Sequence, residues 1–447
     1  MHVSVATWLA LFFVLLGGAA TSRQAKGDTI HSNEIPPQWL LHAERPAHLR
    51  HDTLQANRLW RRQALRDDGG GLRLASKSLR IEAIYKTEVF SVVNGGLQRG
   101  TTHLGNVDLT LTVDLAEQLD WKGATLFFYM LGNHGGALSE KVGELQGLTN
   151  IEAPTTLKLY EAWFEQTLFD DRLSFKAGLY DLNTEFDAIE TAGLFINSSH
   201  GIGPDFSQSG VNGPSIFPTT SLGVRVKAPL TKGVAIQAAV LDGVPGDPNN
   251  PRGTHIKFGK GEGALLTSEL TYLGGANEKA GVPFRRVVLG TWYYTAASTE
   301  DASGNAISPS HNRGLYLVVE QSIYRESDDR SQGLTLFGRY GIAEGVINQL
   351  ASYLGGGAVY QGLIPGRGED QLGFAVATAY NSSHFRDAMQ QAERIFDHSE
   401  VVLELTYRTS ITPWLAIQPD VQYIINPGTD PTIGNALVVG TRLEFSF

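Results

Sequence analysis

The stretch of sequence that decides the fold closes the chain, where residues 435–447 read NALVVGTRLEFSF. Apolar and polar side chains alternate here with a period of two, which is the period of a β-strand. One face carries the apolar residues Leu437, Val439, Leu443, Phe445 and Phe447. The other face carries the small or polar residues Gly440, Arg442, Glu444 and Ser446. The stretch is therefore predicted to form a two-faced strand.

The final residue of this strand, Phe447, carries a second signal. A terminal strand that ends in an aromatic residue resembles the C-terminal signal of outer-membrane proteins, which the barrel-assembly machinery reads. In such a barrel the aromatic side chains lie at the interface with the outer-membrane lipid. The last strand pairs with the first, so that neither edge stays open. The alternative is an ordinary closing strand that happens to end in Phe.

The opposite end of the chain carries a predicted export signal. An apolar run from Val3 to Leu16 is followed by Gly17-Gly18-Ala19-Ala20, and an apolar core before small residues is typical of a secretory signal peptide. Residues 1–20 are therefore predicted to be removed after Ala20, with an uncleaved anchor as the alternative. No later run of about 18 apolar residues predicts a transmembrane helix. An exported chain without such helices can still span a membrane as a closed barrel.

Composition excludes several classes of site. The 447 residues include 50 Gly and no Cys, and only 18% are charged. The lack of Cys excludes disulfides, thiolate metal sites and a lipoprotein anchor. A formal net charge of −10 argues against a nucleic-acid partner, because binding phosphates requires Lys and Arg. We therefore expect no metal, no cofactor and no nucleic acid.

The segment between the export signal and the first strand differs from the rest. Three prolines, Pro36, Pro37 and Pro46, interrupt its first part, and residues 53–66 are predicted to form a short basic helix. Residues 21–78 are predicted to be a partly helical periplasmic arm or a plug that enters the barrel. A weakly ordered leader is the alternative.

Alternation dominates residues 79–447. In Val107–Leu115, for example, Val and Leu alternate with Asp and Thr. The pattern predicts about sixteen strands, an even number that suits a bacterial barrel, near residues 79–92, 107–117, 124–132, 157–168, 173–181, 220–228, 234–242, 263–273, 286–296, 313–324, 334–342, 357–364, 371–380, 399–408, 414–425 and 435–447. The fold class is therefore all-β, a closed transmembrane antiparallel barrel.

The connections between these strands separate a barrel from a soluble β-sandwich. Short connections, such as residues 169–172 and 409–413, alternate with long ones, such as residues 133–156. Short periplasmic turns opposite long external loops are typical of outer-membrane barrels. The longest connection, residues 182–219, becomes the third external loop. We expect this loop to fold inward and narrow the pore.

The chain resembles a known family, the carbohydrate-selective porins of the OprB type. The resemblance covers most of residues 79–447, and its most specific pieces are LYEAWFEQ at 159–166, FINSS at 195–199, LGVRVK at 222–227, ELTYR at 404–408 and QPDVQY at 418–423. It implies a sixteen-stranded outer-membrane porin of Gram-negative cells, through which glucose and related sugars diffuse passively. The sugar preference comes from the resemblance alone.

Residues predicted to line the pore fall into two sets. Those on the barrel wall are Lys158, Glu161, Trp163, Glu165, Arg225, Lys227, Glu269, Arg339, Glu404 and Arg442; those on the loop include Glu185 and Asp187. Glu161, Trp163 and Glu165 share one strand face, which would offer a sugar an aromatic ring between two carboxylates if Tyr160 faces lipid. The alternative is that these charges form salt bridges that only stiffen the wall.

The sequence leaves three hypotheses about the function of the chain. The first is a carbohydrate-selective porin. The second is a porin of the same architecture for polyols, sugar acids or cations, and the acidic net charge mildly favours cations. The third is a barrel-embedded hydrolase or a soluble β-rich binding protein. Glu161 and Glu165 suggest a glycosidase, but inward carboxylates are expected in a barrel wall, so no catalytic residue is predicted.

Overall fold

The structure is a computed structural model that describes residues 78–274, 284–326 and 331–447. The predicted signal peptide, residues 1–20, lies outside the described residues. So does the predicted arm or plug, residues 21–78, apart from Ser78. No helix in the described ranges is long and apolar enough to cross a membrane.

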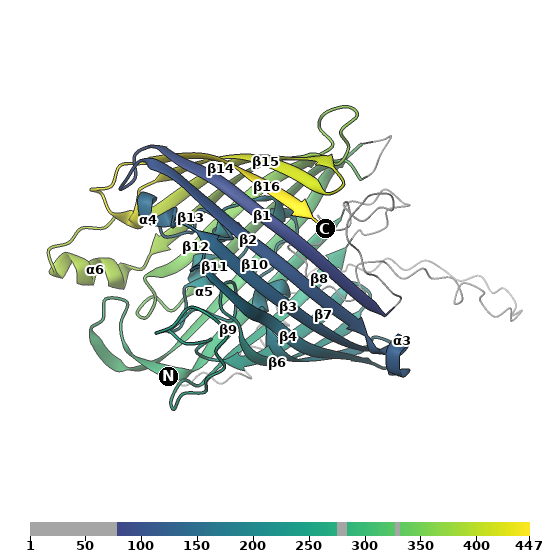
Figure 1. The fold of residues 1–447 in the computed structure, drawn as a ribbon. Helices are drawn as coiled ribbons and strands as arrows, with labels where there is room; N and C mark the ends of the chain where they lie inside the picture. Colours follow the sequence, from purple (N-terminus) through teal and green to yellow (C-terminus); the bar gives the residue numbers. More distant parts are fainter. Residues whose placement is uncertain (1–77, 275–283, 327–330) are drawn as a thin grey trace, which may run out of the picture. The chain divides into compact units, whose positions relative to one another are not determined.

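Sixteen antiparallel strands in the described part of the chain form one closed sheet (Figure 1). Each strand pairs with its neighbours in sequence, and β16 returns to pair with β1. The first eight are β1 (Leu79–Asn94), β2 (Gly100–Asp114), β3 (Ala124–Gly135), β4 (Thr156–Leu168), β5 (Leu173–Tyr180), β6 (Ser221–Thr231), β7 (Val234–Asp242) and β8 (Ala264–Gly274). The last eight are β9 (Arg285–Glu300), β10 (Ala306–Arg325), β11 (Gly333–Ala343), β12 (Leu350–Gln361), β13 (Gln371–Asn381), β14 (Ser399–Thr412), β15 (Leu415–Ile425) and β16 (Ala436–Ser446).

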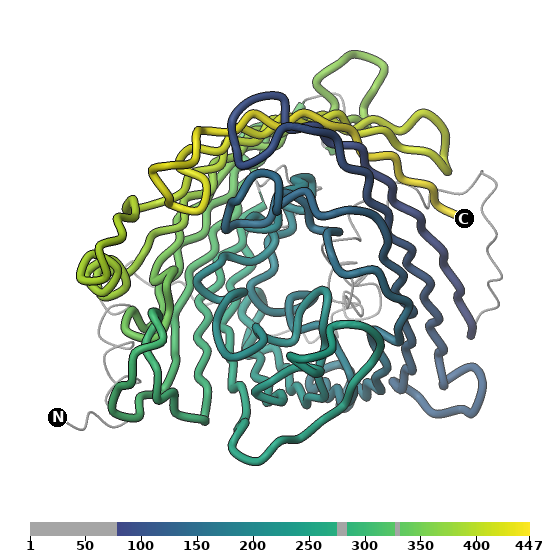
Figure 2. The backbone as a smooth tube through the Cα atoms, turned by 60° about the vertical axis from the view of Figure 1, so that its left-hand side comes forward, coloured from purple at the N-terminus to yellow at the C-terminus, as the bar shows by residue number. Residues whose placement is uncertain are grey.

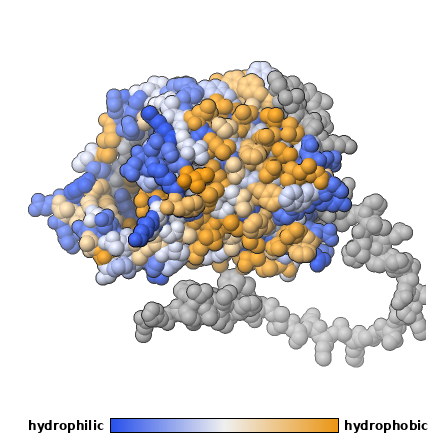
Figure 3. All heavy atoms as spheres, turned by 60° about the horizontal axis from the view of Figure 1, so that its bottom comes forward, coloured by the Kyte–Doolittle hydropathy of each residue, from blue (hydrophilic) through white to orange (hydrophobic). Residues whose placement is uncertain are grey.

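The alternation predicted from sequence sorts side chains between the inside and the outside of this sheet. On β14, Glu400 and Glu404 are fully buried inside the barrel, whereas Leu405 is 49% exposed on the outer face. The outer face carries a broad apolar band between two polar ends (Figure 3). A closed sheet with an apolar exterior leaves no backbone edge open to lipid. The predicted fold class is confirmed.

The predicted strands are all present, but three of them, β2, β10 and β12, begin seven residues earlier than predicted. We expected strands near 107–117, 313–324 and 357–364, whereas the observed ones start at Gly100, Ala306 and Leu350. In β12 the missed part holds glycines, at a place where neighbouring strands approach closely. A Cβ added to Gly357 would lie 2.7 Å from the backbone oxygen of Phe374. Glycine within a strand often marks such an approach.

Most connections sort by length as predicted, although those at residues 95–99, 301–305 and 344–349 are short and lie at the same end as the long loops. At one end, short connections join β4 to β5 and β14 to β15, and the helix α3 (Leu115–Leu119) lies between β2 and β3. At the other end lie the long connections, including residues 136–155, residues 181–220 and a loop with the helix α6 (Ser383–Gln391). We call these the short-turn end and the long-loop end.

The alternation of β4 contains an irregularity that the sequence pattern did not reveal. Opposite β3 the register shifts, so that Tyr129 pairs with Glu161 and Met130 pairs with Leu159. Tyr160 is the extra residue of a β-bulge, and such a bulge redirects a side chain. Tyr160 is therefore buried inside the barrel, where it donates a hydrogen bond to Asp181 (2.6 Å). The expectation that Tyr160 faces lipid was wrong.

Candidate functional site

The connection between β5 and β6, residues 181–220, lies within the ring of strands (Figure 2). It contains three short 3-10 turns, Leu182–Thr184, Thr191–Leu194 and Ser198–His200, and the single-turn helix α5 (Pro204–Ser207). Most of its side chains are buried, including hydrophobic ones such as Phe186 and Phe206. The Phe206 ring stacks on Trp292 of β9, with the ring centroids 5.0 Å apart. We call residues 181–220 the third loop.

One end of the third loop is joined to the wall by Arg225 of β6. Its guanidinium group donates to Glu185 of the loop (2.7 and 2.9 Å) and to Glu165 of β4 (2.7 Å). Lys176 of β5 lies 3.1 Å from the same Glu185 carboxylate. Burial alone would raise the pKa of Glu185, but Arg225 and Lys176 together lower it to about 2. Sequence analysis predicted Glu165, Glu185 and Arg225 as separate pore residues, and the structure joins them in one ion-pair cluster.

A second cluster forms around Arg339 of β11. Its guanidinium group donates to Asp187 (2.6 and 2.7 Å) and to Asp205 (2.6 and 3.2 Å), and all three side chains are fully buried. The rings of Tyr316 and Tyr353 lie 5.5 and 5.3 Å from the guanidinium carbon. A buried charge is costly unless it is paired and hydrogen-bonded. Arg339 therefore binds two separate parts of the third loop to the wall.

Two of the predicted wall carboxylates accept hydrogen bonds from the backbone of the third loop and do not face an open pore. Glu269 of β8 accepts a hydrogen bond from the backbone N–H of Asp187 (2.7 Å). Glu404 of β14 accepts from the backbone N–H groups of Ile196 (2.6 Å) and Asn197 (3.1 Å). His200 of the loop lies 3.6 Å from Glu404, and because burial lowers the pKa of His200 to about 3, this contact is not an ion pair at neutral pH.

The connection between β3 and β4, residues 136–155, also lies against the inner wall, which the sequence did not predict. Its Thr149 donates to Glu88 of β1 (2.7 Å), and its Asn150 accepts from Arg442 of β16 (2.6 Å). It also contacts the third loop, since the N–H of Asn150 donates to the carbonyl oxygen of Ile196 (2.9 Å). We call residues 136–155 the second loop. Its length was visible in the sequence, but its inward path was not.

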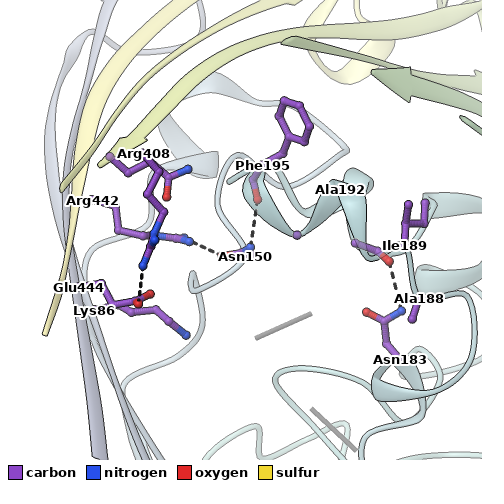
Figure 4. A pocket seen from close by; sticks show the side chains of 13 residues that line it. Lys86, Asn150, Asn183, Ala188, Ile189, Ala192, Phe195, Arg408, Arg442 and Glu444 are labelled. Carbon is purple, nitrogen blue, oxygen red and sulfur yellow. Dashed lines mark hydrogen bonds and ion pairs between the residues drawn. The ribbon is translucent and has the colours of Figure 1, made fainter. Parts of the chain in front are cut away.

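A cavity of about 630 Å³, including space open to solvent, lies between these loops and the first and last strands. Figure 4 shows that its lining has two unlike sides. The wall side carries the charged or amide residues Lys86, Arg408, Gln418, Arg442 and Glu444. The third-loop side carries mainly small or apolar residues, namely Ala188, Ile189, Ala192, Gly193 and Phe195. Asn150 of the second loop, together with Asn183 and Gly201 of the third loop, completes the lining. We call this space the passage.

Several predicted pore residues lie away from the passage. Trp163 is 4% exposed, stacked on Phe127 with ring centroids 4.8 Å apart and covered by the Lys176 ammonium group at 4.4 Å. Its indole N–H donates to Glu161 (3.1 Å), so the ring is packed within the wall and is not an open platform. Lys158 is buried on β4 and Lys227 is half-buried on β6. Of the predicted wall residues, Arg442 is the one that lines the passage.

The structure adds residues that sequence reasoning did not single out. Glu320, Arg286 and Gln418 contact the third-loop backbone, and Lys86 and Arg408 line the passage. Their inward direction follows from period-two alternation, so a complete count of charged residues on inward positions would have found them. Within the described ranges, no group of three or more His, Cys, Asp or Glu residues is placed to hold a metal ion.

Known proteins with similar sequences indicate the family to which this barrel belongs. The family model described as "Carbohydrate-selective porin, OprB family" matches residues 98–447. Porin B of Pseudomonas aeruginosa is 25% identical over 425 residues, which cover 85% of this chain and 90% of that protein. The putative porin QuiX of Acinetobacter baylyi is 21% identical over 427 residues, which cover 88% of this chain and 95% of that protein.

A solved structure shares the fold. OprB of Pseudomonas putida, determined at high pH, superposes with a TM-score of 0.73 at 22% identity, covering 83% of this chain and 94% of that one. Its low-pH structure gives a TM-score of 0.54 at 20% identity. The family match and the closed barrel together identify a channel and not an enzyme. The chain belongs to the OprB family of carbohydrate-selective porins.

Proposed function

We propose that glucose and related hexoses diffuse passively into the periplasm through the passage. The protein is a carbohydrate-selective porin of the Gram-negative outer membrane, and the proposal names the sugar class and the route. The observation that carries it is the two-sided lining, with charged and amide groups on the strands facing Ala188–Phe195 of the third loop.

The chemistry of a pyranose suits such a lining. Its hydroxyl groups need hydrogen-bond partners in place of water, which the Arg408 and Arg442 guanidinium groups supply on the wall side. Its C–H faces are less polar and suit the small or apolar third-loop side, which includes Ala188, Ile189 and Ala192. Arg408 is already paired with Glu444 (3.0 Å) and Arg442 with Glu88 (2.6 Å). We therefore expect sugar binding to be weak, as release from a channel requires.

The inward loops supply the narrowing that the proposal needs. A sixteen-stranded barrel without them leaves an aqueous channel much wider than one sugar. The second and third loops fill part of this space, because their buried residues pack and hydrogen-bond against the wall. The passage is then what remains open beside β1, β14, β15 and β16.

Liposome swelling tests this proposed function. With purified protein in liposomes, we expect glucose to enter faster than a size-matched polar solute without a sugar ring, because only the sugar matches both sides of the passage. Glucose should also reduce ion conductance in planar bilayers by occupying the passage. Equal swelling rates for the sugar and the size-matched solute would contradict a sugar preference and leave a non-selective pore.

A second candidate function, passage of sugar acids, is favoured by the charges that reach the lining. The passage is lined by three cationic side chains, Lys86, Arg408 and Arg442, and by one carboxylate, Glu444. The carboxylates that pair with Lys86 and Arg442 are Asp108 and Glu88, and both are buried outside the lining. The sequence's net charge of −10 had favoured cations, but a local field depends on which charges are near. If anions are preferred, gluconate should swell liposomes at least as fast as glucose, and reversal potentials in a KCl gradient should show chloride preference. A potassium preference would contradict this second candidate.

We also propose two partners for the outside of the barrel. The apolar outer face, with exposed residues such as Leu405 and Phe374, fits the hydrocarbon of outer-membrane lipid. Phe447 is half-exposed at the short-turn end, directly after β16. This accessible aromatic end supports recognition of the terminal strand by the barrel-assembly machinery.

A further inference from the structure

The part of the third loop that faces the passage is held to the barrel through its backbone. At its start, Asp187 donates its N–H to Glu269 (2.7 Å), and in its middle Thr191 donates its N–H to Glu320 of β10 (2.6 Å). At its end, the consecutive N–H groups of Ile196 and Asn197 donate to the two oxygens of Glu404. We call Glu269, Glu320 and Glu404 the wall glutamates.

Two further wall side chains bind carbonyl oxygens of the same segment. Arg286 of β9 donates to the carbonyl oxygen of Ala188 (2.7 Å), and Gln418 of β15 donates to that of Leu194 (2.7 Å). The segment is therefore held by donors and acceptors from five strands. The wall glutamates are at most 2% exposed, and a buried backbone N–H group that loses its acceptor is costly because water cannot replace it.

These contacts do not depend on which side chains the loop carries. Every residue except proline offers the same N–H and C=O groups. Ala188, Ile189 and Ala192 of the same segment belong to the lining of the passage. The path of the loop along the passage is thus controlled at these points by residues of the wall.

We propose that the wall glutamates are positioning residues that set the width of the passage by holding the backbone of residues 187–197. This inference rests on the proposed function in taking the passage as the route of the solute. It goes further by assigning the width to residues that touch no solute.

Replacing Glu404 by Gln tests the inference with little change in side-chain volume. The amide keeps one oxygen acceptor, but it turns an NH₂ group toward the other backbone N–H, which then loses its acceptor. We expect hydrogen exchange at the Ile196 and Asn197 amides to increase roughly tenfold to a hundredfold, from the loss of one buried hydrogen bond. Single-channel conductance and the size limit for neutral oligosaccharides should both increase, and more so in the E320Q/E404Q double variant.

A matched variant separates positioning from general destabilisation. Asp370→Asn removes another buried carboxylate, one that binds Thr409 (2.9 Å) and Arg367 at the short-turn end. We expect it to leave exchange in residues 187–197 and conductance unchanged. An increase in exchange there equal to that of E404Q would indicate general destabilisation.

The outcomes separate this inference from the proposed function. Unchanged exchange or unchanged conductance in both E404Q and the double variant would overturn the positioning role. If E404Q fails to form the compact barrel band in unheated gels, E320Q carries the same test, because Glu320 binds Thr191 and also forms an ion pair with Arg286 (2.8 Å). Hydrogen exchange and ion conductance do not require a sugar. Loosening of the loop in a pore without sugar preference would contradict the proposed function and leave the positioning role intact.

Discussion

Replacing Arg339 by Leu is expected to release the third loop from the wall and convert the narrow passage into a wide pore. The substitution leaves the carboxylates of Asp187 and Asp205 buried without the guanidinium group that now binds both. Removing one partner of a buried ion pair costs about 3–5 kcal/mol, because the remaining charge is uncompensated. Moving the loop into water is the least costly way to hydrate these carboxylates. The barrel strands, whose backbone hydrogen bonds are unaffected, should stay folded.

Planar-bilayer recordings measure this effect directly as a rise in single-channel conductance and a higher size limit for solutes. The matched control is Arg313→Leu, which removes an exposed arginine whose pair with Glu344 spans 3.4 Å. An exposed pair is worth about 0–1 kcal/mol, so this control should conduct like the wild type. The triple variant R339L/D187N/D205N removes all three charges and should recover part of the narrow conductance. Wild-type conductance in R339L would show that the cluster does not hold the loop.

Deleting residues 436–447 is expected to abolish the closed barrel. The deletion removes β16, which pairs with β15 on one side and with β1 on the other. Both neighbours would then present unpaired N–H and C=O groups, each costing several kcal/mol in hydrocarbon. The truncated protein should lack the compact, heat-modifiable band in gels and should be missing from the outer-membrane fraction.

The substitution Phe447→Ala separates closure of the barrel from recognition of its end. Phe447 follows β16 and contributes one backbone hydrogen bond, from its N–H to the carbonyl oxygen of Ala83 (2.9 Å), which alanine retains. Refolding into detergent micelles should therefore proceed as in the wild type, while the amount assembled in cells falls. Equal amounts of both proteins in the outer membrane of cells would contradict a role of the terminal ring in assembly.

The sequence was sufficient for the strands and for the direction of most side chains because both depend on local alternation. Arg225, Glu269, Arg339 and Glu404 were all predicted to point inward, and all are buried inside the barrel. Their partners could not be predicted, since those contacts join distant parts of the chain. Glu404, for example, binds the N–H of a residue 208 positions earlier. Direct roles of these residues in sugar passage stay predictions.

The errors have identifiable physical causes. A bulge in β4 turns Tyr160 inward against the expected alternation. The missed start of β12 includes glycines, which lie within the strand where neighbouring strands are close together. The inward path of the second loop depends on Glu88 and Arg442, which the sequence places at opposite ends of the barrel domain. No pattern within a short window of sequence carries that information.

The pairing of β1 with β16 has a consequence for the timing of folding. Arg442 and Glu88, which bind each other and also Asn150 and Thr149 of the second loop, are 354 positions apart. Contacts of such long sequence separation form late, because the intervening chain must first be ordered. The pairing of β1 with β16 and the second-loop side of the passage should therefore form in the same final step of folding. A folding intermediate in which β1 and β16 are not yet paired would lack a complete passage, so size discrimination between solutes should begin only when the barrel has closed.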